Sequence, residues 1–340
     1  MTNEEQMFDP KQKPLNSGFG AATTAREAAQ GIDLSGKTAI VTGGYSGLGL
    51  ETVRVLSEAG ATVVVPARDP VRGRASVEGI ANVQVDELDL MNPASIEAFT
   101  GRFLASGKAL HILVNSAGIM ATPLMRDSRG FEAQFSTNHL GHFHLTQRLW
   151  PALTAARGAR VVSVSSGGHQ IAPVDFGDIN FERRPYDKWI AYGQSKTANV
   201  LFAVALDKRG KAQNVRAFAL HPGTVLGPLA RHLTEDEIKA FDVYDDQGKV
   251  VIDPQRDLKN FEQGAATAVW CATSPLLAGL GGVYCENCDV AAVTPNDGSS
   301  RFGVNEWAID KDAAEKLWAI SEEMINHPAQ GSGLKSADRS

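Results

Sequence analysis

The chain has 340 residues, of which 43% are hydrophobic and 21% charged, with 33 Gly, 15 Pro and 3 Cys. This composition is typical of a globular protein and excludes intrinsic disorder, collagen and a disulfide-stapled scaffold. The formal net charge of -6 argues against nucleic acid as a partner, because such binding depends on clustered Lys and Arg, and it favours small-molecule or protein partners.

The first part of the chain, residues 1–35, is polar and punctuated by Pro. Thr24 and Glu27 stand at capping-box spacing ahead of a short Ala-rich stretch that Gly31 closes, so a short helix is expected there. We expect residues 1–35 to form an arm that packs on the main domain, and a partly disordered tail is the alternative.

From Lys37 onwards, short β-branched runs such as KTAIVTG, ATVVVPAR and LHILVNSAG alternate with longer amphipathic stretches. Near-continuous Val, Ile and Leu predict strands buried on both faces, and their alternation with helices predicts βαβ units. We therefore predict a single α/β domain over residues 36–330, built on a doubly wound parallel sheet, followed by a tail at 331–340.

Two connections in this domain are longer than the usual few residues. Residues 167–190 separate a strand from a helix, and residues 228–260 are charge-rich with a turn-like DDQGK at their middle. Loops of this length inside a compact domain are usually lids or binding loops. We expect residues 228–260 to be a lid-like insertion near a substrate site.

The first predicted strand runs into a glycine-rich stretch, TGGYSGLG, spanning residues 42–49, and then into a helix. Glycines permit a tight turn and let the backbone approach a pyrophosphate, whose charge is met by unpaired N–H groups at the helix N-terminus. Between a first strand and a first helix, this stretch predicts a dinucleotide-binding turn.

The end of the second strand discriminates between dinucleotides. An acidic residue there binds a ribose 2′-hydroxyl and favours NAD, whereas Ala67 followed by Arg68 leaves room and positive charge for a 2′-phosphate. The sequence predicts NADP as the preferred cofactor, with NAD as the alternative. Arg72 and Arg74 either add to this pocket or form a solvated helix face.

The helix after the fifth strand opens with Tyr192 and carries Lys196, and the i, i+4 spacing puts both side chains on one face. A nearby ammonium and a positive nicotinamide ring would both lower the pKa of the phenol and fit it for proton transfer. The preceding strand ends in Ser165 and Ser166 at the edge of the sheet where ligands bind, and strand alternation lets only one of them face the site.

These motifs together closely resemble the short-chain dehydrogenase/reductase family. The resemblance rests on TGGYSGLG, NSAG at residues 115–118, Asn138, the SVSS strand, Tyr192 with Lys196, and HPGTV at residues 221–225. It extends from Lys37 to about Ala292. The stretches STNHLGHFHLT, EQGAATAVWCAT and GGVYCENCDVA resemble the branch that contains retinol dehydrogenases and WW-domain oxidoreductases.

The resemblance implies a Rossmann fold and a nicotinamide-dependent oxidoreductase that interconverts an alcohol with a ketone or aldehyde. Tyr192 would be the acid/base, Lys196 would lower its pKa and bind the nicotinamide ribose, Ser166 would orient the substrate, and Asn138 would hold a water connecting Lys196 to solvent. Arg68 is already predicted to bind the cofactor from its place at the end of the second strand. The resemblance implies further cofactor-binding residues, which are Gly43, Tyr45, Ser46, Gly47, Leu48, Gly49, Asp89, Leu90, Asn115, Ala117, Gly118, Tyr192, Lys196, Pro222, Gly223, Thr224 and Val225.

One position departs from the family pattern. Gly227 stands where the family usually has Thr or Ser to contact the cofactor's carboxamide, so that contact is either lost or moved to Thr224. We saw no membrane anchor of the kind found in vertebrate retinol enzymes, which argues against a retinoid substrate. Substrate-facing candidates, chosen because they follow the carboxyl ends of strands, are Met120, Gly168, His169, Tyr186, Trp189 and Leu226.

Two other patterns carry less weight. Cys285 and Cys288 form a C-x-x-C without a second pair, and we expect them to pack in the core instead of binding metal or acting in redox chemistry. His139, His142 and His144 share one helix without a completing ligand, which predicts a structural role, with a subunit interface as one place for it. We expect no metal site.

The low, odd number of cysteines predicts a reducing cytoplasm, and the acids and prolines in MTNEEQMFDPKQKP do not fit a signal peptide. No stretch approaches eighteen uninterrupted apolar residues, so we expect no membrane partner. The family resemblance implies a homodimer or homotetramer formed through the helices that carry His139 and Tyr192. The competing function is a non-catalytic NAD(P)-binding sensor or scaffold on the same fold.

Overall fold

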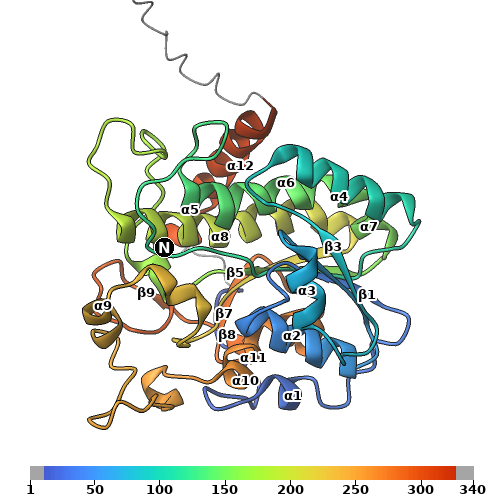
Figure 1. The fold of residues 1–340 in the computed structure, drawn as a ribbon, viewed down its shortest axis with the longest axis horizontal. Coiled ribbons are helices and arrows are strands. Elements are labelled where there is room, and N and C mark those ends of the chain that lie inside the picture. Colours follow the sequence, from blue (N-terminus) through green and yellow to red (C-terminus); the bar gives the residue numbers. More distant parts are fainter. Residues whose placement is uncertain (1–10, 327–340) are drawn as a thin grey trace, which may run out of the picture.

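A computed structural model of the protein describes residues 11–326 and centres on one eight-stranded sheet (Figure 1). The strand order is β3-β2-β1-β4-β5-β6-β7-β8. The predicted tail at 331–340 and the first ten residues of the predicted arm lie outside the described residues. The strands of this sheet are β1 (Thr38–Val41), β2 (Thr62–Ala67), β3 (Val83–Glu87), β4 (Ile112–Asn115), β5 (Ala159–Val164), β6 (Val215–His221), β7 (Val283–Glu286) and β8 (Asp289–Val290).

The sheet is doubly wound, as the sequence predicts. Chain order runs outward from β1 through β2 to β3 on one side and from β4 through β7 on the other, so the order reverses between β1 and β4. Ile40 at the centre of β1 pairs with Val64 of β2 and Leu113 of β4. In open sheets of this kind, ligands bind outside the carboxyl ends of the strands at the point of reversal.

One strand departs from the predicted all-parallel sheet, because β8 runs antiparallel to β7. Asn287 and Cys288 form a two-residue turn with φ angles of 52° and 59°. A turn with both central residues at positive φ returns the chain as a hairpin along the same edge. The predicted strand around Cys285 therefore ends at Glu286, and the chain folds back beside it.

Helices cover both faces of the sheet (Figure 1). Ile40 packs into one layer, whereas its neighbours Ala39 and Val41 pack into the other, which is why the strands are apolar along their whole length. The helices of the first layer are α4 (Pro93–Ala105), α5 (Ala133–Phe135), α6 (Gly141–Arg148), α7 (Trp150–Ala155), α8 (Lys188–Gly210) and α12 (Lys311–Asn326). Those of the second layer are α1 (Ala25–Ala28), α2 (Gly47–Glu58), α3 (Pro70–Ser76), α10 (Phe261–Gly264) and α11 (Ala266–Thr273).

The remaining short elements lie outside these two layers. Helix α9 (Glu235–Lys239) belongs to the 228–260 segment, as do the 3₁₀ turns at Pro228–His232 and Pro254–Arg256. Strands β9 (Val293–Thr294) and β10 (Val304–Asn305) pair with each other in a separate parallel ladder. Four further 3₁₀ turns occur at Gly167–Gln170, Lys211–Gln213, Pro275–Leu277 and Glu306–Ala308.

The helix predicted around Asn138 is not continuous. A π-helical turn at Ser136–Leu140 separates α5 from α6, and α7 begins with a proline in its first turn. A Cβ at Gly141 would lie 2.4 Å from the carbonyl oxygen of Leu90, so the helix passes directly against the loop that follows β3. π-Helical turns inside α-helices are frequently found at functional sites.

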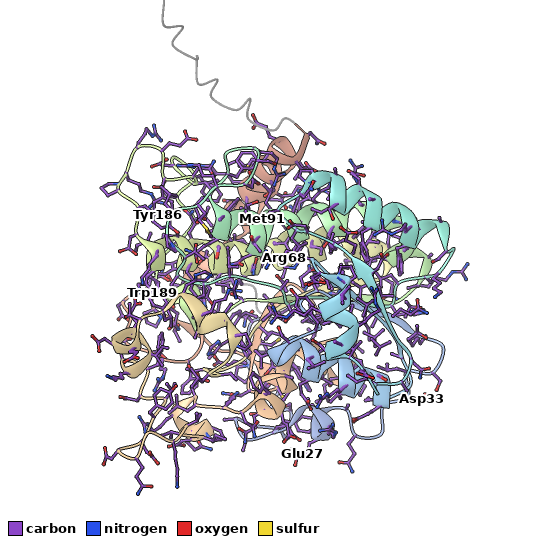
Figure 2. The ribbon with its side chains drawn as sticks, in the orientation of Figure 1. Glu27, Asp33, Arg68, Met91, Tyr186 and Trp189 are labelled. Carbon is purple, nitrogen blue, oxygen red and sulfur yellow. The ribbon has the colours of Figure 1, made fainter. Side chains whose placement is uncertain are left out.

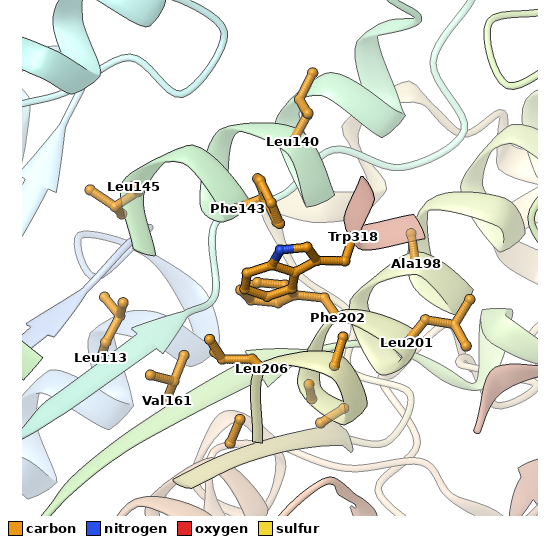
Figure 3. Packing of buried hydrophobic residues seen from close by; sticks show 14 of the residues in the cluster. Leu113, Leu140, Phe143, Leu145, Val161, Ala198, Leu201, Phe202, Leu206 and Trp318 are labelled. Carbon is orange, nitrogen blue, oxygen red and sulfur yellow. The ribbon is translucent and has the colours of Figure 1, made fainter. Parts of the chain in front are cut away.

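Helix α12 packs against α8, and its Trp318 lies beside Phe143 of α6 and Phe202 of α8 (Figure 3). The Trp318 ring stacks on Phe202 at a centroid distance of 6.1 Å and meets Phe143 edge-on at 4.9 Å. His139 hydrogen-bonds to Ser321 of α12 at 2.7 Å. The helix face expected to make a subunit interface is thus occupied within the chain, and the homo-oligomer stays a prediction.

The three histidines of this helix region are buried inside the single chain, which agrees with the structural role predicted for them but leaves none of them at a surface that a second subunit could contact. His142 bonds to Thr42 at 2.8 Å and to the backbone oxygen of Asn138, and His144 bonds to Glu97 at 2.8 Å. Each is at most 3% exposed. Their role is to join helices to the sheet and to one another.

The segment before β1 packs along the far edge of the sheet. Gln12 donates to the backbone oxygens of Tyr284 and Ala291 at 2.9 and 2.7 Å. Thr24 and Glu27 form the predicted capping box at the start of α1. Within residues 11–326, no helix combines the length and apolarity needed to cross a membrane.

Candidate active site

A cavity of about 600 Å³ opens at the carboxyl edge of the sheet, where the strand order reverses. The glycine-rich turn after β1, the end of β2, and the loops that follow β3 and β4 line one end of it. The end of β5, the first turns of α8 and the chain from residue 221 to residue 243 line the rest. The cavity therefore joins the predicted phosphate-binding turn to the predicted catalytic residues.

The glycine-rich turn leaves bare backbone facing the cavity. Gly43 has a φ of +67°, and a Cβ there would lie 3.0 Å from the Cα of Ala117. A Cβ at Gly49 would lie 2.4 Å from the Gly43 oxygen. Ser46 precedes α2, and its side chain makes no capping hydrogen bond in the part of the chain that the structure describes. The first N–H groups of α2 are therefore available to an anion, which fits the pyrophosphate of a dinucleotide.

The predicted cofactor residues are distributed unevenly around the cavity. Asn115 is buried beneath it, where its amide donates to Thr146 at 3.4 Å and its oxygen has no partner within residues 11–326. The other predicted residues that line the cavity are Gly43, Tyr45, Ser46, Gly47, Leu48, Gly49, Arg68, Asp89, Leu90, Ala117, Gly118, Tyr192, Lys196, Pro222, Gly223, Thr224 and Val225.

The end of the cavity beside β2 is positively charged. Arg68 and Arg72 line it together with Met91, and Figure 2 labels Arg68 and Met91 above α3. Neither arginine makes an ion pair within the described range 11–326. Arg74 does not line the cavity. The buried Ala67 leaves the space beside Arg68 free of an acidic side chain, in agreement with the sequence.

Helix α8 begins at Lys188, one turn earlier than predicted, because the Asp187 side chain accepts hydrogen bonds from the N–H groups of Trp189 and Ile190. This places Tyr192 in the second turn. Gly168 packs against the Tyr192 ring so tightly that a Cβ at Gly168 would lie 2.7 Å from it.

The two serines that end β5 point in opposite directions, as strand alternation requires. Ser165 donates to the backbone oxygen of Lys196 at 2.7 Å and is 2% exposed. The Ser166 hydroxyl accepts from the N–H of Gly168 at 3.0 Å, and it lies with the Tyr192 ring beside Gly168, where it favours the ionised phenol. Ser166 is therefore the residue whose hydroxyl meets the Tyr192 phenol.

Burial governs the acidity of Tyr192 and Lys196. The Lys196 ammonium lies 5.6 Å from the centre of the Tyr192 ring and donates to the Val164 oxygen at 3.0 Å. Desolvation raises the pKa of Tyr192 to about 12 despite the hydrogen bond from Ser166, and it lowers the pKa of Lys196 to about 8. The predicted lowering of the Tyr192 pKa is not found in the chain by itself, because desolvation outweighs the favourable partners.

Asn138 lies in the π-helical turn and connects the loop after β4 to α8. Its oxygen accepts from the N–H of Ile119 at 2.9 Å, and its amide donates to the Ile119 oxygen and to Ser195, each at 2.9 Å. A Cβ at Gly118 would lie 3.1 Å from the Asn138 oxygen and 3.7 Å from the Lys196 ammonium nitrogen. Asn138 is thus close to Lys196, and the hydrogen bonds of its side chain go to other residues of the protein, Ile119 and Ser195.

The predicted substrate residues divide into three groups. Met120 and Leu226 line the cavity. Gly168 and Trp189 lie behind its wall, and the Trp189 ring contacts Tyr192 edge-on at 6.3 Å. His169 and Tyr186 are the third group, and neither lines the cavity.

For His169 and Tyr186 the structure contradicts the prediction. His169 is fully buried, and its ring hydrogen-bonds to the backbone oxygen of Ser166 at 2.8 Å and to the Tyr284 hydroxyl at 3.3 Å. The Tyr186 hydroxyl donates to the Thr122 oxygen at 3.0 Å. Both side chains turn away from the cavity because buried polar groups of the surrounding loops require them as partners.

The cavity also contains residues that the sequence analysis did not select. They come mostly from the start of the 228–260 segment, whose loop conformation follows no periodic pattern. The length of that segment indicated that it could line a substrate site, but the length did not indicate which of its residues face the cavity. The missed lining residues include Met125, Leu229, Arg231, His232, Leu233, Ile238, Phe241, Val243 and Phe261.

The HPGTV turn is fixed by hydrogen bonds beneath it. His221 lies 2.9 Å from Asp257, whose same oxygen accepts from the Thr224 hydroxyl at 3.1 Å. A Cβ at Gly227 would lie 3.0 Å from the Phe261 ring. A side chain at residue 227 would therefore require the Phe261 ring to shift by a few tenths of an ångström.

The C-x-x-C pair is buried in the core, as predicted. Cys285 and Cys288 are each 0% exposed, and burial raises the pKa of Cys288 to about 12. A reactive thiol requires the opposite shift. Across the described residues 11–326, no group of three or more His, Cys, Asp or Glu is placed to hold a metal ion.

Comparisons with known proteins agree with this architecture. A family model described as short chain dehydrogenase matches residues 37–238. A "Probable oxidoreductase" of Streptomyces antibioticus is 46% identical over 301 residues, covering 86% of this chain and 99% of that protein. Retinol dehydrogenase 12 of Mus musculus is 37% identical over 302 residues, covering 86% of this chain and 88% of that protein.

A solved structure of an uncharacterised protein from Mycobacterium Paratuberculosis has a TM-score of 0.67 and 32% identity, covering 88% of this chain and 97% of that one. The matched region contains the glycine-rich turn, Ser166, Tyr192 and Lys196. The relatives lie in the branch that the sequence motifs indicated. The chain belongs to the short-chain dehydrogenase/reductase family of oxidoreductases, in its retinol-dehydrogenase-like branch.

Proposed function

We propose that the protein is an NADP-preferring oxidoreductase that interconverts a ketone or aldehyde with the corresponding alcohol. The observation that carries this proposal is the meeting of the Ser166 hydroxyl and the Tyr192 phenol next to Lys196, in a cavity whose other end carries Arg68. A protein that only senses the cofactor has no need for this set of hydroxyls at the substrate end.

The cofactor would lie along the cavity. The backbone of Gly43 to Gly49 and the N-terminus of α2 would hold its pyrophosphate, and Arg68 would meet the 2′-phosphate. Lys196 would bind the nicotinamide ribose and Asn138 would support Lys196. When bound, the nicotinamide supplies or accepts the hydride.

The chain's own residues handle the proton. Ser166 would orient the carbonyl oxygen towards Tyr192, and the phenol would donate its proton to that oxygen during reduction. With its pKa raised to about 12 by burial, Tyr192 carries that proton at neutral pH. The Lys196 ammonium, 5.6 Å from the ring, stabilises the phenolate that remains.

The substrate would bind against the 228–260 segment, which we propose to be a lid. Apolar side chains that include the five named below face the cavity near Tyr192 or along this segment. They favour a substrate with a substantial apolar group beside its carbonyl. These side chains are Met120, Leu226, Ile238, Phe241 and Val243.

The direct test follows oxidation of NADPH and of NADH with a panel of aliphatic, aromatic and quinone-like carbonyls. Tyr192→Phe removes the acid and should lower kcat by about 10²- to 10⁴-fold. Tyr244→Phe, at an exposed tyrosine outside the cavity, is the matched control and should leave the rate unchanged.

Each other result has a definite meaning. Full activity of Tyr192→Phe would show that Tyr192 is not the acid. A clear preference for NADH would contradict the role given to Arg68. Binding of both cofactors without turnover on a broad panel would favour the sensor or scaffold function.

A further inference from the structure

The 228–260 segment begins with a turn that lies over the glycine-rich loop. This 3₁₀ turn, Pro228–His232, follows Gly227 directly. A Cβ at Gly47, the first residue of α2, would lie 3.8 Å from the Cδ of Pro228. The start of the segment is therefore in contact with the predicted phosphate-binding turn.

Arg231 in this turn lines the cavity together with Tyr45, Arg68 and Arg72. Its one hydrogen bond within residues 11–326 goes from Nη1 to the Pro228 oxygen at 3.2 Å, inside its own turn. Desolvation lowers the pKa of Arg231, and the neighbouring positive charge of Arg68 lowers it further. Two guanidinium groups from distant parts of the chain thus face the same space.

No carboxylate in residues 11–326 pairs with these arginines. Asp69, at the start of α3, accepts from the N–H groups of Val71 and Arg72. Asp89, which also lines the cavity, accepts from the N–H of Met91 at 3.0 Å. By contrast, the buried Arg216 has a bidentate carboxylate partner. Gathering like charges without a counter-charge is unfavourable unless an anion binds between them.

We propose that Arg231 binds the cofactor's 2′-phosphate together with Arg68, and that this contact closes the 228–260 segment over the substrate. The inference rests on the proposed function, which puts the adenosine end of the cofactor beside Arg68. Ile238, Phe241 and Val243 follow Arg231 within the same segment and line the substrate end of the cavity. The 2′-phosphate would thereby both set cofactor preference and order the substrate wall.

The first test measures dissociation constants for NADPH and NADH by fluorescence titration. Arg231→Leu should weaken NADPH binding by about tenfold and change NADH binding by less than about twofold, because the lost charge-assisted contact exists only with the 2′-phosphate. Arg68→Leu should behave in the same way. Arg256→Leu is the matched control, since Arg256 belongs to the same segment, pairs with Asp242 and does not line the cavity.

The second test requires no turnover. Endoproteinase Lys-C cleaves only after lysine, so its sites at Lys239 and Lys249 inside the segment remain intact in the Arg231→Leu variant. We expect 2′,5′-ADP to slow this cleavage several-fold while ADP does not. Arg231→Leu should abolish the protection. Circular dichroism of the variant should match that of the wild type, because the side chain is exposed.

The outcomes separate the inference from the function on which it rests. If Arg68→Leu loses the preference for NADPH and Arg231→Leu retains both preference and protection, the inference is overturned and the proposed function stands. If the wild-type protein binds NADH as tightly as NADPH, the predicted cofactor preference fails, and the inference fails with it.

Discussion

The indole nitrogen of Trp189 donates a hydrogen bond of 3.3 Å to the carboxylate of Glu237. Trp189 lies in the first turn of α8, three residues before Tyr192, and Glu237 lies on α9 in the 228–260 segment. The Trp189 ring also contacts Phe241 at 5.9 Å. The segment proposed as a lid is thus attached to the helix that carries the proposed acid.

Glu237→Ala should loosen this attachment. The change removes the acceptor for Trp189 and the ion pair to Lys188 at 2.5 Å, so KM for the carbonyl substrate should rise about 3- to 10-fold with a smaller change in kcat. The hydrogen bonds from Lys188 and Thr234 lower the pKa of Glu237 to about 2, so the effect should be constant between pH 5 and 8. Glu235→Ala on the same helix is the control, and an unchanged KM in Glu237→Ala would refute the attachment.

The pH dependence of kcat/KM for NADPH should follow the ionisation of Lys196. Burial lowers the pKa of Lys196 to about 8, so the ammonium is charged below that pH and becomes neutral above it. The kcat/KM for NADPH, which reflects the free enzyme, should therefore fall above pH 8. Tyr192, with a pKa of about 12, stays protonated over the same range. A profile that remains flat from pH 7 to pH 10 would contradict this assignment.

Acid should unfold the protein through its buried histidines. Burial lowers the pKa of His139 to about 3 and those of His142 and His169 to about 4, so all three stay neutral in the folded state while the unfolded chain protonates near pH 6.5. Their contribution to the free energy of unfolding is complete above pH 6.5 and is lost as pH falls from 6.5 towards 4. For each of these histidines, the contribution to the free energy of unfolding falls by about 1.4 kcal/mol per pH unit in this window.

Urea unfolding at pH 7.5, 6.0 and 5.0 measures this loss. The midpoint should fall steeply below pH 6.5, and His169→Gln should reduce the dependence on pH, because one of the buried histidines is gone. A midpoint that is the same at pH 7.5 and pH 5.0 would show that these histidines do not control acid stability.

Two ion pairs should differ sharply in their contribution to stability. Asp207 and Arg216 are both buried and form two hydrogen bonds of 2.7 and 2.8 Å, which join the end of α8 to β6. Asp207→Asn leaves the Arg216 charge buried without a counter-charge and should destabilise the fold by about 3–5 kcal/mol.

The matched control is Glu315→Gln, which weakens the partly exposed ion pairs with Arg209 and Lys208 and should lower the free energy of unfolding by less than about 1 kcal/mol. Chemical denaturation of both variants at pH 7.5 compares them directly. Equal losses in the two variants would show that burial does not set the strength of these pairs.

Much of the fold and the centre of the site could be predicted from the sequence because they depend on local periodicity. The alternation of apolar runs with helices gave the doubly wound sheet, and the position of the glycines after the first strand gave the phosphate-binding turn. Tyr192 and Lys196 share a helix face at i, i+4, and Ser165 and Ser166 must alternate along a strand. These relationships hold whatever the rest of the chain does.

Tertiary packing decided the rest. His139 is buried beneath α12, Tyr186 turns away from the cavity, and Arg231 faces the same cavity as Arg68, although no short spacing connects these residues to their partners. Loops follow no repeating geometry, and the direction of their side chains depends on which distant groups need a partner. The sequence by itself therefore determined the chemistry at the ends of the strands, whereas only the folded chain decided which loop residues share the cavity with it.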